Sequence, residues 1–310
     1  MHFEPDCHFA GEQMPPDTKN RDESEWSRFY RLPEFDSLEV LHAHFVSHRY
    51  ARHVHDYLVV GLVERGTQSY WYRGARHVTP PGRIFLVSPG EPHTGEAASP
   101  EGYVYRTICL QEKHLARWTQ DMGRGAGRTS FRAAVLHDRH LAALLTSFHR
   151  CIREQAPALE SESFLLQAMA RMLTCHSDDQ AEPKPAGRER PAIARARDYI
   201  DSHYADDVSL SRLAEIASLS PFYFARAFRS ETGLPPHLYL ENVRIRRVRA
   251  FLDRGEPLGR AAAMAGYSDQ SHLTRRFKRF LGITPGQYVR QAGIRPDGRS
   301  SGDRRGSPAE

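Results

Sequence analysis

Three histidines have residue types and a spacing that suit either metal coordination or ligand binding. His53 and His55 are separated by one residue, so a β-strand would place both side chains on one face, with Tyr57 following. His93 ends a second segment with the pattern G-x5-SPGEPH, residues 82–93. Because imidazole nitrogens bind zinc and iron, these three histidines are the candidate ligands if a metal is present.

The two histidine segments together resemble the two motifs of cupin β-barrels. In a metal-binding cupin, a glutamate follows the first histidine pair by four or five residues, but here Val59 and Val60 stand at those positions. The segment also lacks an acid–base pair close to the motif, as a catalytic site would require. We therefore predict no catalytic residue, no cofactor and no metal. Pocket-lining or structural roles for the histidines remain as alternatives.

An aromatic cluster accompanies the histidines. Tyr70, Trp71 and Tyr72 are consecutive, and Tyr103 and Tyr105 follow on a later alternating segment. Such side chains could stack on a sugar or an apolar ligand, or they could be core. The predicted effector-binding residues are His53, His55, Tyr57, Tyr70, Tyr72 and His93.

The C-terminal third contains an internal repeat with an offset of 48 residues, then 49. In the first copy, Leu210, Leu213, Ala214 and Ala217 share one helical face, and small alanines allow close approach of a second helix. Matched pairs at the two offsets are Leu210 and Leu258, Ala214 and Ala262, Ala217 and Ala265, Arg226 and Arg275, Phe228 and Phe277, Gly233 and Gly282, Pro236 and Pro285, and Tyr239 and Tyr288.

Each copy predicts a helix, a tight turn and a second helix. In the first copy Ser220 is a suitable N-cap with Pro221 at the first helical position, and Gly233 ends the helix after Thr232. In the second copy Asp269 is the predicted cap. The inward residues are Phe224, Phe228, Leu273 and Phe277, and the outward residues are Phe222, Ala225, Arg226, Arg229, Gln270, Ser271, His272 and Arg275.

These repeats are similar to the paired helix-turn-helix units of the AraC/XylS family of bacterial transcription activators. The match runs over roughly residues 193–290, and GYSDQSHLTRRFKRFLGITPGQY, residues 266–288, carries the family signature. The resemblance implies base reading by the outward residues, although Ala225 replaces a residue that is often polar. The predicted DNA-binding residues are Phe222, Ala225, Arg226, Arg229, Gln270, Ser271, His272, Arg275, Arg276 and Lys278.

The resemblance extends to the N-terminal part, because residues 38–110 look like the arabinose-binding-type cupin of the same family. It implies a metal-free effector pocket in a transcription regulator that is not an enzyme. The competing interpretation is a metal-dependent cupin enzyme that carries a DNA-binding module. The expected partners are a double-stranded DNA operator, an unidentified small-molecule effector and RNA polymerase.

The elements that position these residues differ along the chain. Short alternating runs between Leu38 and Leu110 predict antiparallel β-structure, and two amphipathic helices follow. In the first of them, a stripe with the spacing 4, 3, 4 could form a homodimer seam or pack on its own barrel; it comprises Leu141, Leu145, Phe148 and Ile152.

The expected fold is therefore a multi-domain α and β protein, with a cupin-like barrel, two helices and an all-α domain. The expected segments are a disordered lead-in at 1–35, an effector and dimerisation domain at 36–177, a linker at 178–190, a double helix-turn-helix domain at 191–292 and a disordered tail at 293–310.

Charge and cysteine content support these assignments. The net charge of +5 is unevenly distributed. Residues 191–292 have 16 Arg or Lys against 10 Asp or Glu, a balance of +6, residues 1–190 have 23 against 25, a balance of −2, and residues 293–310 have 4 against 3, a balance of +1. A basic C-terminal segment favours a polyanion as partner. Four scattered cysteines and no membrane-length apolar run predict a cytoplasmic protein without a membrane partner.

Overall fold

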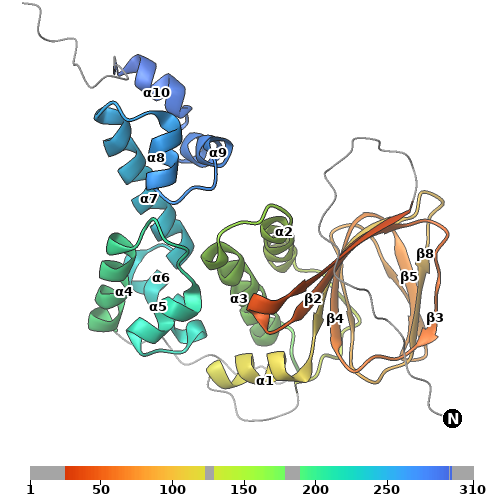
Figure 1. The fold of residues 1–310 in the computed structure, drawn as a ribbon. Helices are drawn as coiled ribbons and strands as arrows, with labels where there is room; N and C mark the ends of the chain where they lie inside the picture. Colours follow the sequence, from red (N-terminus) through yellow and green to blue (C-terminus); the bar gives the residue numbers. More distant parts are fainter. Residues whose placement is uncertain (1–24, 123–128, 179–188, 293, 295–310) are drawn as a thin grey trace, which may run out of the picture.

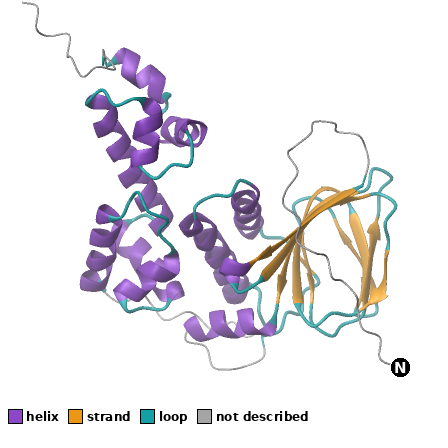
Figure 2. Ribbon diagram, in the orientation of Figure 1, coloured by secondary structure: helices purple, strands orange, loops and turns teal. Residues whose placement is uncertain are grey.

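A computed structural model describes residues 25–122, 129–178, 189–292 and 294, and it places a β-rich part before a helical part (Figure 1). Figure 2 shows the strands gathered at one end of the molecule and the helices of the C-terminal third at the other. No helix in these described ranges is both long enough and apolar enough to cross a membrane.

Two antiparallel sheets face each other and form the predicted barrel. The larger sheet has the order β1-β2-β9-β4-β7-β10 and the smaller has the order β3-β8-β5-β6. The strands of the larger sheet are β1 (Trp26–Leu32), β2 (Leu38–Phe45), β4 (Leu58–Gly66), β7 (Ile84–Val87), β9 (Tyr103–Leu110) and β10 (Val135–Leu136). Those of the smaller sheet are β3 (Tyr50–His53), β5 (Gln68–Tyr72), β6 (Ala75–Thr79) and β8 (His93–Ala97).

Strand β9 shows how the larger sheet separates two environments. Because side chains alternate along a strand, Tyr105, Thr107 and Cys109 line a cavity between the sheets. Ile108 and Leu110, on the other face of the strand, are fully buried in a different apolar cluster, which includes the helices that follow the barrel. One face of the sheet therefore forms a pocket wall, and the other is the platform for the helices.

Three helices follow the barrel: α1 (Glu112–Asp121), α2 (Arg139–Arg153) and α3 (Ala158–Cys175). The stripe of Leu141, Leu145 and Phe148 on α2 is at most 1% exposed, and the Phe148 ring meets Phe35 edge-on. The stripe therefore packs on its own barrel, so the homodimer seam predicted as one alternative is not available on this face.

The C-terminal part contains α4 (Arg190–Ser202), α5 (Leu210–Ala217), α6 (Pro221–Thr232), α7 (Pro236–Asp253), α8 (Leu258–Met264), α9 (Gln270–Leu281) and α10 (Pro285–Gln291). The helix caps and helix ends predicted for the repeat are confirmed. The Ser220 hydroxyl accepts a hydrogen bond from the Tyr223 amide, and the Asp269 carboxylate accepts one from the His272 amide. Gly233 and Gly282 end α6 and α9 in the left-handed conformation that glycine allows.

Several boundaries differ from the sequence prediction. Trp26–Leu32 forms β1 and pairs with β2 along its whole length, although this segment was expected in a disordered lead-in. Alternation in it is weak, because β1 is an edge strand with mostly exposed side chains. Helix α1 was not predicted, and α4 begins at Arg190, inside the expected linker. Residues 1–24, 179–188, 293 and 295–310, where the rest of the lead-in, the linker and the tail were expected, lie outside the described residues.

Candidate effector pocket and DNA interface

A cavity of about 130 Å³ lies between the two sheets of the barrel. Both sheets contribute side chains to it, so it is an internal pocket of the barrel rather than a groove on one sheet. Its lining comprises Leu41, Tyr50, His53, His55, Tyr57, Val59, Gln68, Tyr70, Phe85, Val87, His93, Thr94, Gly95, Tyr105, Thr107 and Cys109.

The structure brings the three predicted histidines together at this cavity. The ring centroids of His53 and His93 are 4.2 Å apart, and those of His55 and His93 are 4.7 Å apart. The His55 ring also stacks on Tyr57 at 4.2 Å with an interplanar angle of 5°. Burial and the neighbouring His93 lower the pKa of His55 to about 4, so this ring is neutral at pH 7.

The histidine cluster does not fit a metal ion. Within the described ranges, no group of three or more His, Cys, Asp or Glu side chains has an arrangement that could hold one. The positions where a cupin carboxylate ligand would stand are Val59, which lines the cavity, and Val60, which is buried on the other face of β4. No metal-dependent chemistry is therefore assigned to this site.

Two side chains at the cavity have buried polar atoms without a hydrogen-bond partner. Gln68 is 5% exposed and its side-chain carbonyl oxygen is unpartnered, and both ring nitrogens of His55 are buried and unpartnered as well. A buried polar atom that lacks a partner costs about 1–3 kcal/mol. Both residues line the cavity, so a rotation of these side chains toward a bound ligand would give the atoms a partner and remove that cost.

The pocket residues predicted from sequence are placed as follows. His53, His55, Tyr57, Tyr70 and His93 line the cavity. Tyr72 does not: its side chain is 2% exposed in the core, and its hydroxyl accepts a hydrogen bond from the Ser88 amide. Tyr105, which the sequence offered either as a pocket wall or as core, lines the cavity. The prediction missed Tyr50, Gln68, Thr107 and Cys109, although alternation along β5 and β9 places Gln68 on the face of Tyr70, and Thr107 and Cys109 on the face of Tyr105.

In the first helix-turn-helix unit, α5 and α6, the expected reading face is partly covered. Arg229 is exposed and Ala225 and Arg226 are half-buried, but Phe222 is only 3% exposed. Phe222 was predicted to point outward. It lies instead within the apolar cluster that includes α1 and α3, because the first turn of α6 packs against α1.

In the second unit, α8 and α9, most of the predicted reading face is open. Gln270, Ser271, Arg275 and Lys278 are exposed, whereas His272 is half-buried. Arg276 was predicted to contact DNA, but its side chain is 16% exposed and forms an ion pair with Glu160 of α3. The prediction placed it outward because helical spacing alone does not reveal a neighbouring domain.

A barrel with an internal pocket, joined to two helix-turn-helix units, defines a two-domain DNA-binding transcription regulator. Two family models match the chain: the AraC-like ligand binding domain over residues 37–169 and a helix-turn-helix domain over residues 213–291. The chain belongs to the AraC/XylS family of transcription regulators.

Relatives with curated descriptions agree with this assignment. An HTH-type transcriptional regulator of Bacillus subtilis, YbfI, is 28% identical over 231 residues, which cover 74% of this chain and 82% of the relative. The transcriptional activator RhaS of Pectobacterium carotovorum is 22% identical over 78% of this chain and 88% of its own length. These names describe transcription regulators, which favours a regulatory role over the competing enzymatic interpretation.

Among solved structures, the C-terminal domain of AraT, a response regulator from Geobacillus stearothermophilus, is similar to part of the chain. It is 31% identical, covers 34% of this chain and 88% of that domain, and has a TM-score of 0.32.

Proposed function

We propose that the barrel cavity binds a small-molecule effector and that the bound effector changes the affinity of the helix-turn-helix units for an operator. The observation that carries this proposal is the unpartnered carbonyl oxygen of Gln68, which is buried at a cavity lined by both sheets. A ligand that pairs with this oxygen binds only the folded barrel, and it can therefore shift the protein between states that differ in the cavity.

On the DNA side, the exposed residues of α9 are the proposed base readers. Gln270 and Arg275 have side chains that pair in bidentate fashion with adenine and guanine, and Ser271 lies beside Gln270 at the helix start. Ala225, Arg226 and Arg229 of α6 are the corresponding candidates in the first unit. The proposal includes RNA polymerase as a partner and the cytoplasm as location, and activation is the favoured outcome because the RhaS relatives are named activators.

A two-stage screen tests the effector site. A panel of neutral, anionic and cationic small molecules is first scored by the thermal stability of the full-length protein. Compounds that stabilise it are then tested for a change in affinity for an operator duplex, which is selected from a random pool by the same protein. Thr107→Trp, which fills the cavity, should abolish both effects.

The control is Trp71→Phe, because Trp71 lies on the same sheet as Gln68 but is 54% exposed and points away from the cavity. If cavity-dependent ligands bind and operator affinity stays unchanged, the barrel does not regulate DNA binding and the proposal is wrong.

A further inference from the structure

A buried arginine lies where the two helix-turn-helix units meet. Arg244 stands near the middle of α7, the helix that joins the units, and it is 3% exposed. Its guanidinium donates one hydrogen bond to the Tyr204 carbonyl oxygen at 2.7 Å and another to the Asp206 carbonyl oxygen at 2.9 Å. Both acceptors belong to the loop that leads from α4 into α5 of the first unit. Arg244 therefore fixes this loop to α7.

The turn between α8 and α9 of the second unit contacts the same loop. Gly266 has a φ of +76°, and a Cβ atom at this position would overlap the Ala205 carbonyl oxygen, so the two backbones approach as closely as glycine allows. The ring of the next residue, Tyr267, lies 5.9 Å from the guanidinium carbon of Arg244. The Tyr267 hydroxyl donates a hydrogen bond to the buried Glu241 carboxylate of α7 at 2.8 Å. The turn is therefore attached both to α7 and to the loop of the first unit.

These contacts form one interunit junction, which comprises Tyr204, Ala205, Asp206, Glu241, Arg244, Gly266 and Tyr267. It lies where the apolar cores of the two units separate. Leu240 and Val243 of α7 belong to the apolar cluster that includes the first unit, whereas Ile245 and Val248 belong to the cluster of the second unit. Arg244 stands between them, so the junction adds polar contacts between the units at the boundary of their cores.

The junction is close in sequence to both DNA-reading parts. Tyr267 is followed by Ser268, by the cap Asp269 and then by Gln270, the first residue of α9. On the other side, the loop with Asp206 leads to Leu210, the first residue of α5, which packs on α6. A movement at the junction therefore changes the position of α9 relative to α6.

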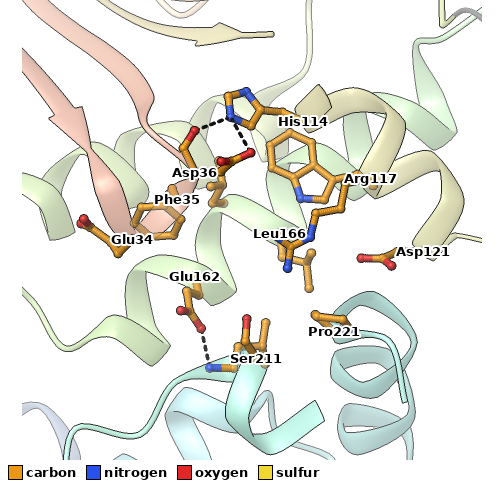
Figure 3. Close-up of a pocket in the computed structure, with 13 residues that line it drawn as sticks. Glu34, Phe35, Asp36, His114, Arg117, Asp121, Glu162, Leu166, Ser211 and Pro221 are labelled. Atoms are coloured by element: carbon orange, nitrogen blue, oxygen red, sulfur yellow. Dashed lines mark hydrogen bonds and ion pairs between the residues drawn. The ribbon is translucent and has the colours of Figure 1, made fainter. Parts of the chain in front are cut away.

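Helix α3 is a second structure that contacts both units, and it has to be separated from the junction experimentally. Figure 3 shows Glu162 extending from α3 to the start of α5, where its carboxylate accepts a hydrogen bond from the Leu210 amide. Glu160 of the same helix forms the ion pair with Arg276 of α9. The relative position of the units could therefore depend on α3 as well as on Arg244, and substitutions in the two places distinguish these causes.

We propose that Arg244 sets the spacing between the two DNA segments that the units of one chain read, because the junction holds α6 and α9 at a fixed separation and rotation. This inference rests on the proposed reading of an operator by both units. Arg244 acts as a positioning residue, since its side chain is buried at the junction and holds other residues in place. One base pair added between the segments shifts the second by about 3.4 Å and rotates it by about 35° around the duplex.

The test uses the full-length protein and the operator that it selects from a random pool. Footprinting locates the two protected segments, and duplexes with one base pair added or removed between them are compared with the selected duplex. The ratio of the two affinities is the spacing penalty. It should be at least about tenfold for the wild type, because rigidly held units leave the difference to be absorbed by deformation of the DNA.

Arg244→Met should bind the selected operator about fivefold more weakly, because a smaller fraction of the molecules then has both units in the productive orientation. Its spacing penalty should fall below about threefold, since units that are less firmly held can follow the altered duplex. A merely structural loss would lower the affinity for every duplex by the same factor and leave the penalty unchanged. Arg244→Lys keeps the charge but lacks the fork that reaches two carbonyl oxygens, so its penalty should be intermediate.

Three controls keep the wild-type penalty if Arg244 is responsible. Arg246→Met removes an arginine from the same helix, but the Arg246 side chain is 68% exposed and lies 4.0 Å from Asp201. Any phosphate contact that it makes is lost equally on all duplexes. Glu162→Ala and Glu160→Gln each weaken one contact between α3 and a unit and leave the junction residues unchanged.

Circular dichroism and thermal melting establish which variants are folded. A wild-type penalty in folded Arg244→Met overturns the proposal, and if that variant does not fold, a wild-type penalty in Arg244→Lys does so. A reduced penalty in Glu162→Ala or Glu160→Gln, with none in the Arg244 variants, would assign the spacing to α3 instead. A wild-type footprint over one groove would also overturn the inference while operator binding stands, whereas a protein that selects no operator contradicts the proposed function itself.

Discussion

His149 is a buried histidine that makes the stability of the barrel part depend on pH. It is 4% exposed, and burial, together with Arg106 and His42, lowers its pKa to about 3. The folded protein keeps this ring neutral, whereas the unfolded chain takes up a proton near pH 6.5. Its contribution is therefore complete above pH 6.5 and is lost progressively as the pH falls toward 3.

Between pH 7.5 and 5.5, this histidine should lower the free energy of unfolding by about 1.4 kcal/mol. His149→Gln should remove that part of the pH dependence, whatever its effect on stability at pH 7.5. His140→Gln is the control, because His140 lies on the same helix and is exposed. Urea unfolding at the two pH values measures both slopes, and equal slopes for wild type and His149→Gln would contradict the prediction.

Substitutions of Arg275 and Lys278 distinguish recognition of the base sequence from general affinity for DNA. Arg275 is exposed near the middle of α9, and Lys278 lies in its last turn. If Arg275 contacts a guanine, Arg275→Ala should cost about 1–3 kcal/mol on the operator and relax the preference at one base pair. Lys278→Ala should weaken operator and random DNA alike and reduce the salt slope by about one. Equal losses on both DNAs for Arg275→Ala would place that side chain on the phosphate backbone.

At the scale of elements, α2 stabilises the barrel from outside. Leu145 is 1% exposed within the cluster that joins the larger sheet to α2 and α3. Leu145→Ala should therefore lower the free energy of unfolding by about 2–5 kcal/mol. Thr146→Ala, at the exposed neighbouring position, should change it little. A soluble, stable Leu145→Ala protein with an altered oligomeric state would instead favour a dimer seam.

The helices and strands differ in how well they could be predicted from the sequence. The turns of the repeat were predictable to the residue, because caps such as Ser220, Asp269 and Gly233 act locally. Strand β1 was not, because an edge strand with exposed side chains has no strong alternation. The pocket was predictable around its histidines. Alternation along β5 places Gln68 on the face of Tyr70, but only the pairing of two sheets puts that face at a cavity.

At the scale of the whole molecule, prediction failed where the two parts of the chain meet. Arg276 and Phe222 satisfy every local rule for outward residues of a recognition helix, yet Phe222 is buried and Arg276 is half-buried in an ion pair. Their burial depends on Glu160 and on α1, which are about a hundred residues away in sequence. Helical periodicity describes one helix and its partner, so it has no information about contacts of that range.

The apolar cluster that runs from the barrel through α2 and α3 ends in the first helix-turn-helix unit, while the second unit has a cluster of its own. If the DNA-binding part is separated from the barrel part, the first unit therefore loses apolar contacts, whereas the second unit keeps its own cluster. A fragment of residues 189–292 should expose the apolar surface around Phe222 and leave Arg276 unpaired, so it should aggregate more readily than the full chain. Light scattering of the fragment, with and without Phe222→Lys, would measure this.

The same feature limits how the protein can be recombined. A chimera that joins this DNA-binding part to an unrelated sensor would inherit a surface shaped for α1 and α3, and a new sensor would have to supply a matching acidic and apolar face. Exchange of modules between such proteins should therefore succeed only when the helices that follow the barrel travel with the DNA-binding part.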